Sequence, residues 1–86
     1  MWHVYLLRCA DATLYCGITN DLARRVAAHL AGRVKYTRGR LPVALVYTET
    51  AADRAEASRR ELAVKRLDRA RKLSLIAGAT PVSVGG

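Results

Sequence analysis

Short apolar runs mark three strand-like segments along the chain. His3 to Cys9 contains the run Val4 to Leu7, which is rich in strand formers and is followed by a polar turn, so it predicts a strand. Leu14 to Thr19 predicts its hairpin partner, and Val43 to Thr48 predicts a third strand. Gly17 interrupts the second run, which in a strand indicates a bulge or a close approach of the backbone to another group.

An apolar repeat behind polar cap residues predicts a first helix from about Asp21 to Gly32. Leu22, Val26 and Leu30 recur every four residues, which is the spacing of one helix face.

Two further helices are predicted in the second half of the chain. Thr50 followed by Asp53 forms a capping-box-like pair that predicts the start of a helix running through Val64. A last helix is led by Asp68 and stops at Gly78.

The resulting order, β-β-α-β-α-α, predicts an α+β fold: a small three-stranded antiparallel sheet flanked by helices. Three strands are enough for a stable sheet when helices cover a face of it. We expect a single domain over residues 1–77 and a loose C-terminal tail over residues 78–86, because the tail is made of small residues and contains Gly and Pro.

The charge balance indicates a polyanionic partner. Fifteen Lys and Arg residues against seven Asp and Glu residues give a net charge of +8 on 86 residues, and Gly32 to Pro42 is a basic loop with no acid. This balance excludes an acidic-tail or calcium-loop protein and favours nucleic acid. The alternative is a basic protein that self-repulsion keeps in solution.

The Cys and His residues argue against a structural zinc site, and the lengths of the apolar runs indicate where the protein is located. Two Cys and two His lack the paired spacing of a structural zinc site. No leader-like segment and no run long enough to span a bilayer is found, so we expect a cytoplasmic protein that does not contact membranes. Cys9 and Cys16 should then be reduced and buried.

Four residues stand out as candidates for chemistry. Tyr5 and Tyr15 lie on the two strands of the predicted hairpin, Arg25 on the first helix and Glu61 on the second. Taken singly, each has an ordinary explanation: an aromatic at the edge of the core, a solvated helix residue, or half of an i, i+4 ion pair.

Together, however, these residues form a recognisable pattern. Val4-Tyr5-Leu6, Tyr15-Cys16-Gly17, Arg25 and Glu61 resemble the motifs of the GIY-YIG nuclease superfamily, and the resemblance covers residues 2–76. The chain looks like the short, single-domain bacterial branch of UPF0213-like proteins. The loop Lys35-Tyr36-Thr37-Arg38 and the helix segment Arg60-Glu61-Leu62-Ala63-Val64-Lys65 carry that likeness.

The resemblance implies a metal-dependent endonuclease that hydrolyses phosphodiester bonds, with DNA in repair or recombination as the expected substrate. It assigns water activation to Tyr15, a supporting hydrogen bond to Tyr5, and a place beside the phosphate to His29. The guanidinium of Arg25 suits the charge that develops on phosphoryl oxygens. Glu61 suits one divalent ion, Mg²⁺ or Mn²⁺, because such ions take few protein carboxylates beside phosphate and water.

The chain departs from the family pattern at three points. Tyr5 is the middle residue of the first triplet rather than the last. Ile18 stands where several relatives have a Lys close to the reacting phosphate, and Leu73 lies near where some have a metal-proximal Asn. These departures concern the turnover rate more than the type of reaction.

The pairing of the hairpin raises a separate difficulty. A turn over Ala10 to Thr13 would pair Arg8 with Tyr15 and place Tyr5 and Tyr15 on opposite faces of the sheet. A bulge or a different loop length is therefore needed if both tyrosines serve one site.

Basic residues outside these motifs predict substrate binding through phosphates without base reading, and hence a preference for nucleic-acid structure over sequence. Tyr36 can either stack on an unpaired base or cap the core. The expected binding residues are Arg33, Lys35, Tyr36, Arg38, Arg40, Lys65 and Arg66, with Arg69, Arg71 and Lys72 further along.

Two other functions fit the sequence less fully. One is a weakly active or inactive nucleic-acid-binding module on the same fold, and the other is a basic ribosome- or RNA-associated protein. Glu61 argues for the enzyme, since a pure binder has no need of a carboxylate there. We expect a monomer without a small-molecule cofactor, and the sequence leaves DNA and RNA both open as substrates.

Overall fold

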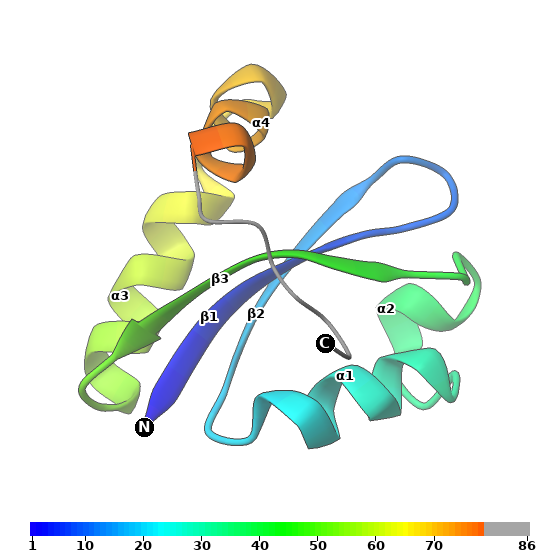
Figure 1. The fold of residues 1–86 in the computed structure, drawn as a ribbon, viewed down its shortest axis with the longest axis horizontal. Helices are drawn as coiled ribbons and strands as arrows, with labels where there is room; N and C mark the ends of the chain where they lie inside the picture. Colours follow the sequence, from blue (N-terminus) through cyan, green and yellow to red (C-terminus); the bar gives the residue numbers. More distant parts are fainter. Residues whose placement is uncertain (79–86) are drawn as a thin grey trace.

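A computed structural model of the chain describes residues 1–78. Its single sheet is antiparallel, with strand order β2-β1-β3: β1 (Trp2–Arg8), β2 (Leu14–Thr19) and β3 (Ala44–Ala51) (Figure 1). The helices are α1 (Leu22–Leu30), α2 (Lys35–Arg38), α3 (Arg54–Lys65) and α4 (Arg69–Gly78). The predicted α+β fold is thus confirmed. The one element not expected is the short α2 within the basic loop, and residues 79–86 of the predicted tail lie outside the description.

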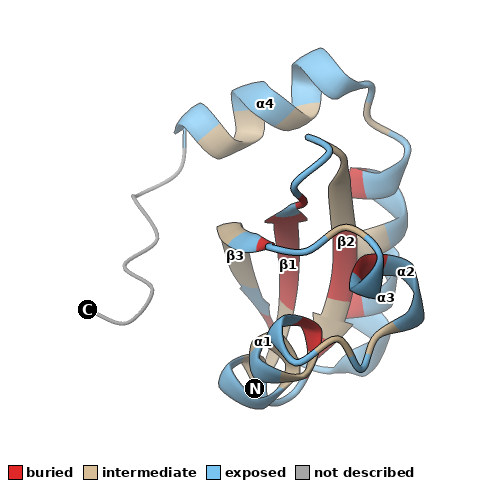
Figure 2. Cartoon of the chain, turned by 90° about the vertical axis from the view of Figure 1, so that its right-hand side faces the viewer, coloured by how far each residue is buried: buried red, intermediate tan, exposed pale blue. Residues whose placement is uncertain are grey.

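The central strand β1 is covered on both faces. Its four consecutive residues Val4 to Leu7 are completely buried, and Figure 2 shows buried residues gathered on β1 and β2. Side chains alternate between the two faces of a strand, so Val4 and Leu6 point one way and Tyr5 and Leu7 the other. An apolar run without alternation is what a strand covered on both faces requires.

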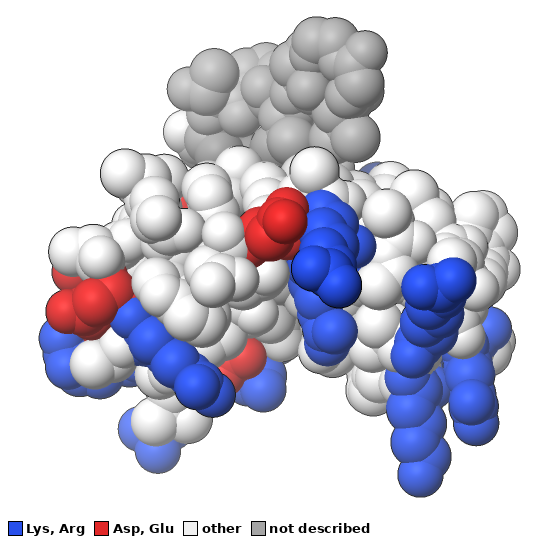
Figure 3. All heavy atoms as spheres, turned by 90° about the horizontal axis from the view of Figure 1, so that it is seen from below, with Lys and Arg blue, Asp and Glu red and all other residues white. Residues whose placement is uncertain are grey.

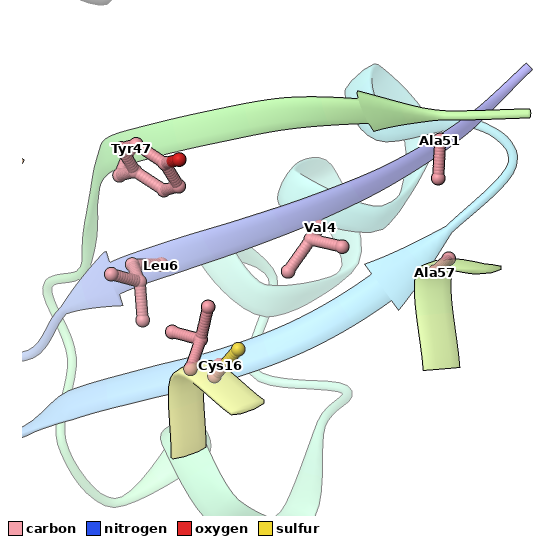
Figure 4. Close-up of a cluster of buried hydrophobic side chains, with 7 residues drawn as sticks. Val4, Leu6, Cys16, Tyr47, Ala51 and Ala57 are labelled. Atoms are coloured by element: carbon pink, nitrogen blue, oxygen red, sulfur yellow. The ribbon is translucent and has the colours of Figure 1, made fainter. Parts of the chain in front are cut away.

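Each face of the sheet has its own core cluster. Val4, Leu6 and Cys16 pack with Ala57 and Val64 of α3 on one face (Figure 4). On the other face, Tyr5, Leu7, Cys9 and Val43 pack with Tyr15 and with Leu22 of α1. Both cysteines are buried and not disulfide-bonded, as expected.

Aspartates cap three of the helices. The carboxylates of Asp21, Asp53 and Asp68 accept hydrogen bonds from the backbone amides of Arg24, Glu56 and Arg71 at 3.1, 2.8 and 2.8 Å. These bonds satisfy amides that have no partner within the helix. The expected pairing of Thr50 with Asp53 is wrong, because Thr50 belongs to β3 and Asp53 itself is the cap.

The buried side of α1 differs from the apolar repeat. Leu30 is 53% exposed, whereas its neighbour His29 is completely buried. The helix turns His29 inward because the imidazole has hydrogen-bond partners there.

Within residues 1–78, no helix is both long and apolar enough to cross a membrane.

Candidate active site

Tyr5 and Tyr15 lie on the same face of the sheet. The loop Cys9 to Thr13 is one residue longer than the expected turn, so Leu7 pairs with Tyr15 and Tyr5 pairs with Gly17. The tyrosine rings are 6.3 Å apart between centroids. The longer loop therefore removes the difficulty that the sequence raised. The bulge of the sheet lies instead between β1 and β3, at Leu6 and Leu7.

Gly17 leaves room for the Tyr5 hydroxyl group. A Cβ atom on residue 17 would lie 2.5 Å from Tyr5 Oη and 2.6 Å from Cζ, distances that no carbon atom tolerates. The strand pairing continues unbroken through Gly17. Of the two explanations that the sequence offered for this glycine, the close approach is the one that holds.

A chain of hydrogen bonds fixes the Tyr5 hydroxyl group. Arg25 Nε donates to Tyr5 Oη at 3.4 Å, and Tyr5 Oη is 3.0 Å from His29 Nε2. His29 Nδ1 in turn is 2.7 Å from Thr37 Oγ1, which bonds weakly to the Val34 carbonyl at 3.5 Å. The directions agree when Tyr5 donates to Nε2 and Nδ1 donates to Thr37.

The protonation states of the hydrogen-bonded residues Tyr5 and His29 follow from their burial. Tyr5, His29 and Thr37 are all completely buried. Burial raises the pKa of Tyr5, although the hydrogen bond from Arg25 acts against it. Burial, aided by the positive charge of Arg25, lowers the pKa of His29. Near neutral pH His29 is therefore an uncharged imidazole that accepts from Tyr5.

His29 acts through Tyr5. Both of its ring nitrogens have partners, and none of its surface is exposed. In this arrangement it is a positioning residue, and its contact with a phosphate stays a prediction that would require the chain of hydrogen bonds to open.

Tyr15 occupies the accessible side of the cluster. It is half-buried, and its ring lies 5.1 Å from that of His29 and 5.2 Å from that of Tyr36. The guanidinium carbon of Arg40 stands 4.4 Å above the Tyr36 ring. Tyr36 is 43% exposed, so it neither caps the core fully nor stands free of it.

Arg25 connects this cluster to the molecular surface. The hydroxyl groups of Tyr5 and Tyr15 raise its pKa, Tyr5 by the larger amount. Arg25 lines two surface hollows of about 530 and 300 Å³. A permanently charged guanidinium held between tyrosine hydroxyl groups and open hollows is suited to receive an anionic group.

Glu61 belongs to the opposite face of the sheet from the tyrosines. It lies on α3, which packs against the Cys16 side of β2, and within residues 1–78 no hydrogen bond or ion pair joins it to Tyr5, Tyr15 or Arg25. Its side chain is 23% exposed, and Lys65 Nζ is 3.6 Å from Glu61 Oε2. Burial raises the pKa of Cys16 to about 11, with Glu61 as the next cause.

No group of three or more His, Cys, Asp or Glu residues that could hold a metal ion occurs within residues 1–78. Glu61 offers a single carboxylate, and a single carboxylate ligand is compatible with an ion such as Mg²⁺, which takes only one or two carboxylates from a protein.

The predicted binding residues divide between two regions. Arg33, Lys35 and Arg38 are exposed next to Tyr36, and to the right of the central acidic residue in Figure 3 the visible charged side chains are basic. Lys65 and Arg66 are exposed at the end of α3. Arg40 is less available to bind a phosphate, because its guanidinium group already pairs with Asp11, with Nε 3.0 Å from Oδ2.

The sequence did not indicate Thr37 as part of the site. Its contact with His29 arises only because α2 returns the chain to α1, and the spacing of the two residues gives no sign of this. The threonine lies within the segment Lys35-Tyr36-Thr37-Arg38 that carries the family likeness, but its contact with His29 is visible only in the fold.

Residues 1–74 match the GIY-YIG catalytic domain. The chain belongs to the GIY-YIG family. The predicted resemblance is thereby confirmed, and GIY-YIG proteins are nucleases that act on nucleic acid and generally use a divalent metal ion.

Its relatives are UPF0213 proteins. One from Desulfotalea psychrophila is 53% identical over 77 residues, covering 87% of this chain and 70% of the relative. One from Halobacterium salinarum is 53% identical over 76 residues, covering 87% and 99%. The solution NMR structure of a UPF0213 protein from Bacillus halodurans matches with a TM-score of 0.58 at 43% identity, covering 90% of this chain and 84% of that one.

Proposed function

We propose that this GIY-YIG protein is a magnesium-dependent endonuclease that hydrolyses phosphodiester bonds of DNA in repair or recombination, reading structure rather than sequence. The observation that carries the proposal is the position of Arg25, hydrogen-bonded to Tyr5 Oη and lining two surface hollows. Phosphodiester hydrolysis builds negative charge on phosphoryl oxygens, and a preorganised guanidinium meets that charge without having to reorient.

Tyr15 is the proposed general base. Tyr5 cannot easily serve, because its hydroxyl group already donates to His29 and accepts from Arg25 in a completely buried position. Tyr15 is half-buried, which leaves its hydroxyl group nearer to a water molecule on the surface. The Tyr15 oxygen can take a proton from water only as the phenolate, after its own proton has left, and the Arg25 guanidinium beside it is the cation that would stabilise that negative charge.

Glu61 is the proposed metal ligand. Because β2 is an outer strand of the sheet, a phosphate lying along its edge could be approached from Tyr15 on one face and from Glu61 on the other. A bound Mg²⁺ would supply Lewis-acid stabilisation of the phosphoryl oxygens. Glu61 would hold the ion with one carboxylate, and Lys65 beside it would limit the local negative charge.

The remaining parts of the proposal concern context. Exposed Arg33, Lys35 and Arg38 would bind backbone phosphates beside the tyrosines and carry no sequence preference. We propose that the protein works in the cytoplasm as a monomer and without a small-molecule cofactor.

The test is a cleavage assay with labelled single-stranded, duplex, flap and branched DNA and with RNA, each with and without Mg²⁺. We expect Mg²⁺-dependent cleavage of one of the DNA structures. Tyr15→Phe should keep the fold and the binding affinity while cleavage falls on the order of 100-fold, because general-base removal costs about that much.

Two outcomes would contradict the proposal. Binding without cleavage of any substrate under any divalent ion would leave a nucleic-acid-binding module on this fold. Wild-type cleavage by Tyr15→Phe would reduce Tyr15 to a packing residue.

A further inference from the structure

A second group of residues meets at the end of the sheet where β1 begins. A hollow of about 300 Å³ is lined by Trp2, Ile18, Thr19, Asn20, Arg25 and Arg54. Figure 1 shows why such distant residues meet: the N-terminus, the turn from β2 into α1 and the start of α3 lie at the same end of the fold. Neither Trp2 nor Arg54 belongs to the motifs that indicated the family.

The lining of this hollow is positively charged. Arg25 comes from α1 and Arg54 from the first turn of α3, so helices on opposite faces of the sheet each contribute a guanidinium group. No carboxylate lines the hollow, and neither arginine forms an ion pair within the described part of the chain. Two guanidinium groups without acidic partners favour a phosphate group, which each can bind through paired N–H donors.

Trp2 adds an aromatic surface to the same hollow. Its side chain is half-buried against the core cluster beside α3. The guanidinium carbon of Arg54 lies 5.8 Å from the centre of the indole ring, which is near the outer limit of a cation–π contact. Arg54 is exposed, so its guanidinium group can turn to a phosphate and leave the indole to a base.

We propose that this hollow binds one nucleotide of the substrate, with its phosphate between Arg25 and Arg54 and its base against Trp2. The inference rests on the proposed function for its substrate class, and it adds Trp2 and Arg54 as substrate-binding residues. A base must leave its stack to reach the indole, so the subsite favours single-stranded or unpaired nucleotides. The apolar side chain of Ile18 contributes no charge, so the positive charge of the hollow comes from Arg25 and Arg54.

Trp2 is the single tryptophan of the chain, so its fluorescence reports directly on the hollow. Wild-type protein is titrated in EDTA with a labelled single-stranded DNA oligonucleotide and with a matched abasic one. Anisotropy of the label measures binding while Trp2 emission is recorded. We expect saturable quenching that follows binding for the first oligonucleotide, and binding with little quenching for the abasic one.

The variants are Arg54→Gln and the matched control Arg59→Gln, which removes one charge from the same helix outside the hollow. Arg54→Gln should weaken binding of the oligonucleotide about tenfold relative to Arg59→Gln, because it removes a contact rather than only a distant charge. Circular dichroism and melting temperature confirm that both variants are folded.

The results separate the subsite from the nuclease. If the oligonucleotide binds and is cleaved with Mg²⁺ while Trp2 emission stays constant, the subsite is wrong and the proposed function stands. Equal affinities of Arg54→Gln and Arg59→Gln also overturn the subsite. Quenching and loss of affinity as expected, without cleavage of any of the single-stranded, duplex, flap or branched substrates, would support the subsite and contradict the nuclease.

Discussion

At the scale of single residues, the position of Tyr5 depends on the absence of a side chain at Gly17. Gly17→Ala would bring Cβ to 2.5 Å from Tyr5 Oη, and Tyr5 is completely buried with little room to move. We expect a loss of about 1 to 3 kcal/mol in the free energy of unfolding, since overpacking of a core costs that much. The cleavage rate should fall together with the stability, because a displaced Tyr5 loses its hydrogen bonds with Arg25 and His29. Urea unfolding and the cleavage assay measure the two effects.

Gly39→Ala is the control for this experiment. A Cβ atom there meets nothing within 4 Å, and the φ angle of −88° suits any residue. Its stability and activity should equal those of the wild type. A Gly17→Ala protein as stable as Gly39→Ala would show that Tyr5 is not held where the structure has it.

The buried imidazole of His29 makes stability depend on pH. Burial holds its pKa below the ordinary value of 6.5, so below that pH the unfolded chain takes up a proton that the folded state refuses. Stability is therefore highest above pH 6.5 and falls as the pH drops below it, until the folded-state pKa is reached. One such proton gives a slope of at most about 1.4 kcal/mol per pH unit.

This pH effect is measured as the free energy of unfolding in urea between about pH 7.5 and pH 5.5. His29→Gln should be less stable overall but should lose this part of the slope, whereas His3→Gln should keep it. An unchanged slope in folded His29→Gln would assign the pH dependence to other groups.

The residues that sequence alone could identify are those that define the family pattern. Tyr5, Tyr15 and Arg25 come together in the structure as a shared site requires. Thr37 could not be foreseen, because a contact between an α1 side chain and an α2 side chain depends on tertiary packing that leaves no periodic trace in the sequence.

At the scale of elements, the strands and the longer helices followed from apolar patterns and caps, but pairing did not. The face on which Tyr15 lies depends on the length of one loop, Cys9 to Thr13, since a shift of one residue reverses every side chain. Within that loop Ala12 has a φ angle of 68°, an uncommon value for alanine, so the sequence carried no clear signal for it. Likewise, α2 is too short for periodicity to reveal.

Helix α3 carries the residue on which the metal assignment depends. Glu61→Gln keeps the shape of the side chain and removes its charge, so Mg²⁺-dependent cleavage should be abolished. Binding of DNA should persist or strengthen, because a negative charge is lost from a protein of net charge +8. The melting temperature should change little, since the ion pair with a Lys65 side chain that is 52% exposed contributes only a few tenths of a kcal/mol.

Lys65→Gln is the matched control, because it breaks the same ion pair and keeps the carboxylate. Cleavage by both variants is measured at saturating DNA, since Lys65 is itself an expected binding residue. If both variants cleave normally and melt alike, Glu61 is a structural residue and the metal assignment fails. Loss of cleavage confined to Glu61→Gln supports the assignment.

At the scale of the whole molecule, the basic residues are not equivalent. Some are held by the fold: Arg40 Nε pairs with Asp11, and Arg69 donates to the carbonyl of Ala12 at 2.7 Å. Lys35 and Arg38 instead lie exposed on α2, on either side of Tyr36 and Thr37 in the sequence. Net charge, which the sequence gives directly, thus indicates the class of partner, while the fold indicates which charges lie near the tyrosines.

This difference predicts the salt dependence of binding. Each phosphate that the protein neutralises releases counterions, so the logarithm of affinity should fall linearly with the logarithm of salt concentration, with a slope of several units. Removing Lys35 and Arg38 together should lower that slope by about two, because each neutralised phosphate contributes a slope of about 0.9. Anisotropy titrations over roughly 50 to 200 mM salt measure this slope for the wild type and the variant.

The control replaces Arg59 and Arg60 of α3, so that it removes the same formal charge as the Lys35 and Arg38 variant. Arg60 is already paired with Glu49, and both residues line a hollow on the β3 side that also holds Glu49 and Glu56. If a change of net charge alone weakened binding, both double variants would have equal slopes. If the basic surface beside α2 contacts phosphates directly, only the Lys35 and Arg38 variant loses slope. An affinity for nucleic acid that does not change with salt would contradict an electrostatic interface altogether.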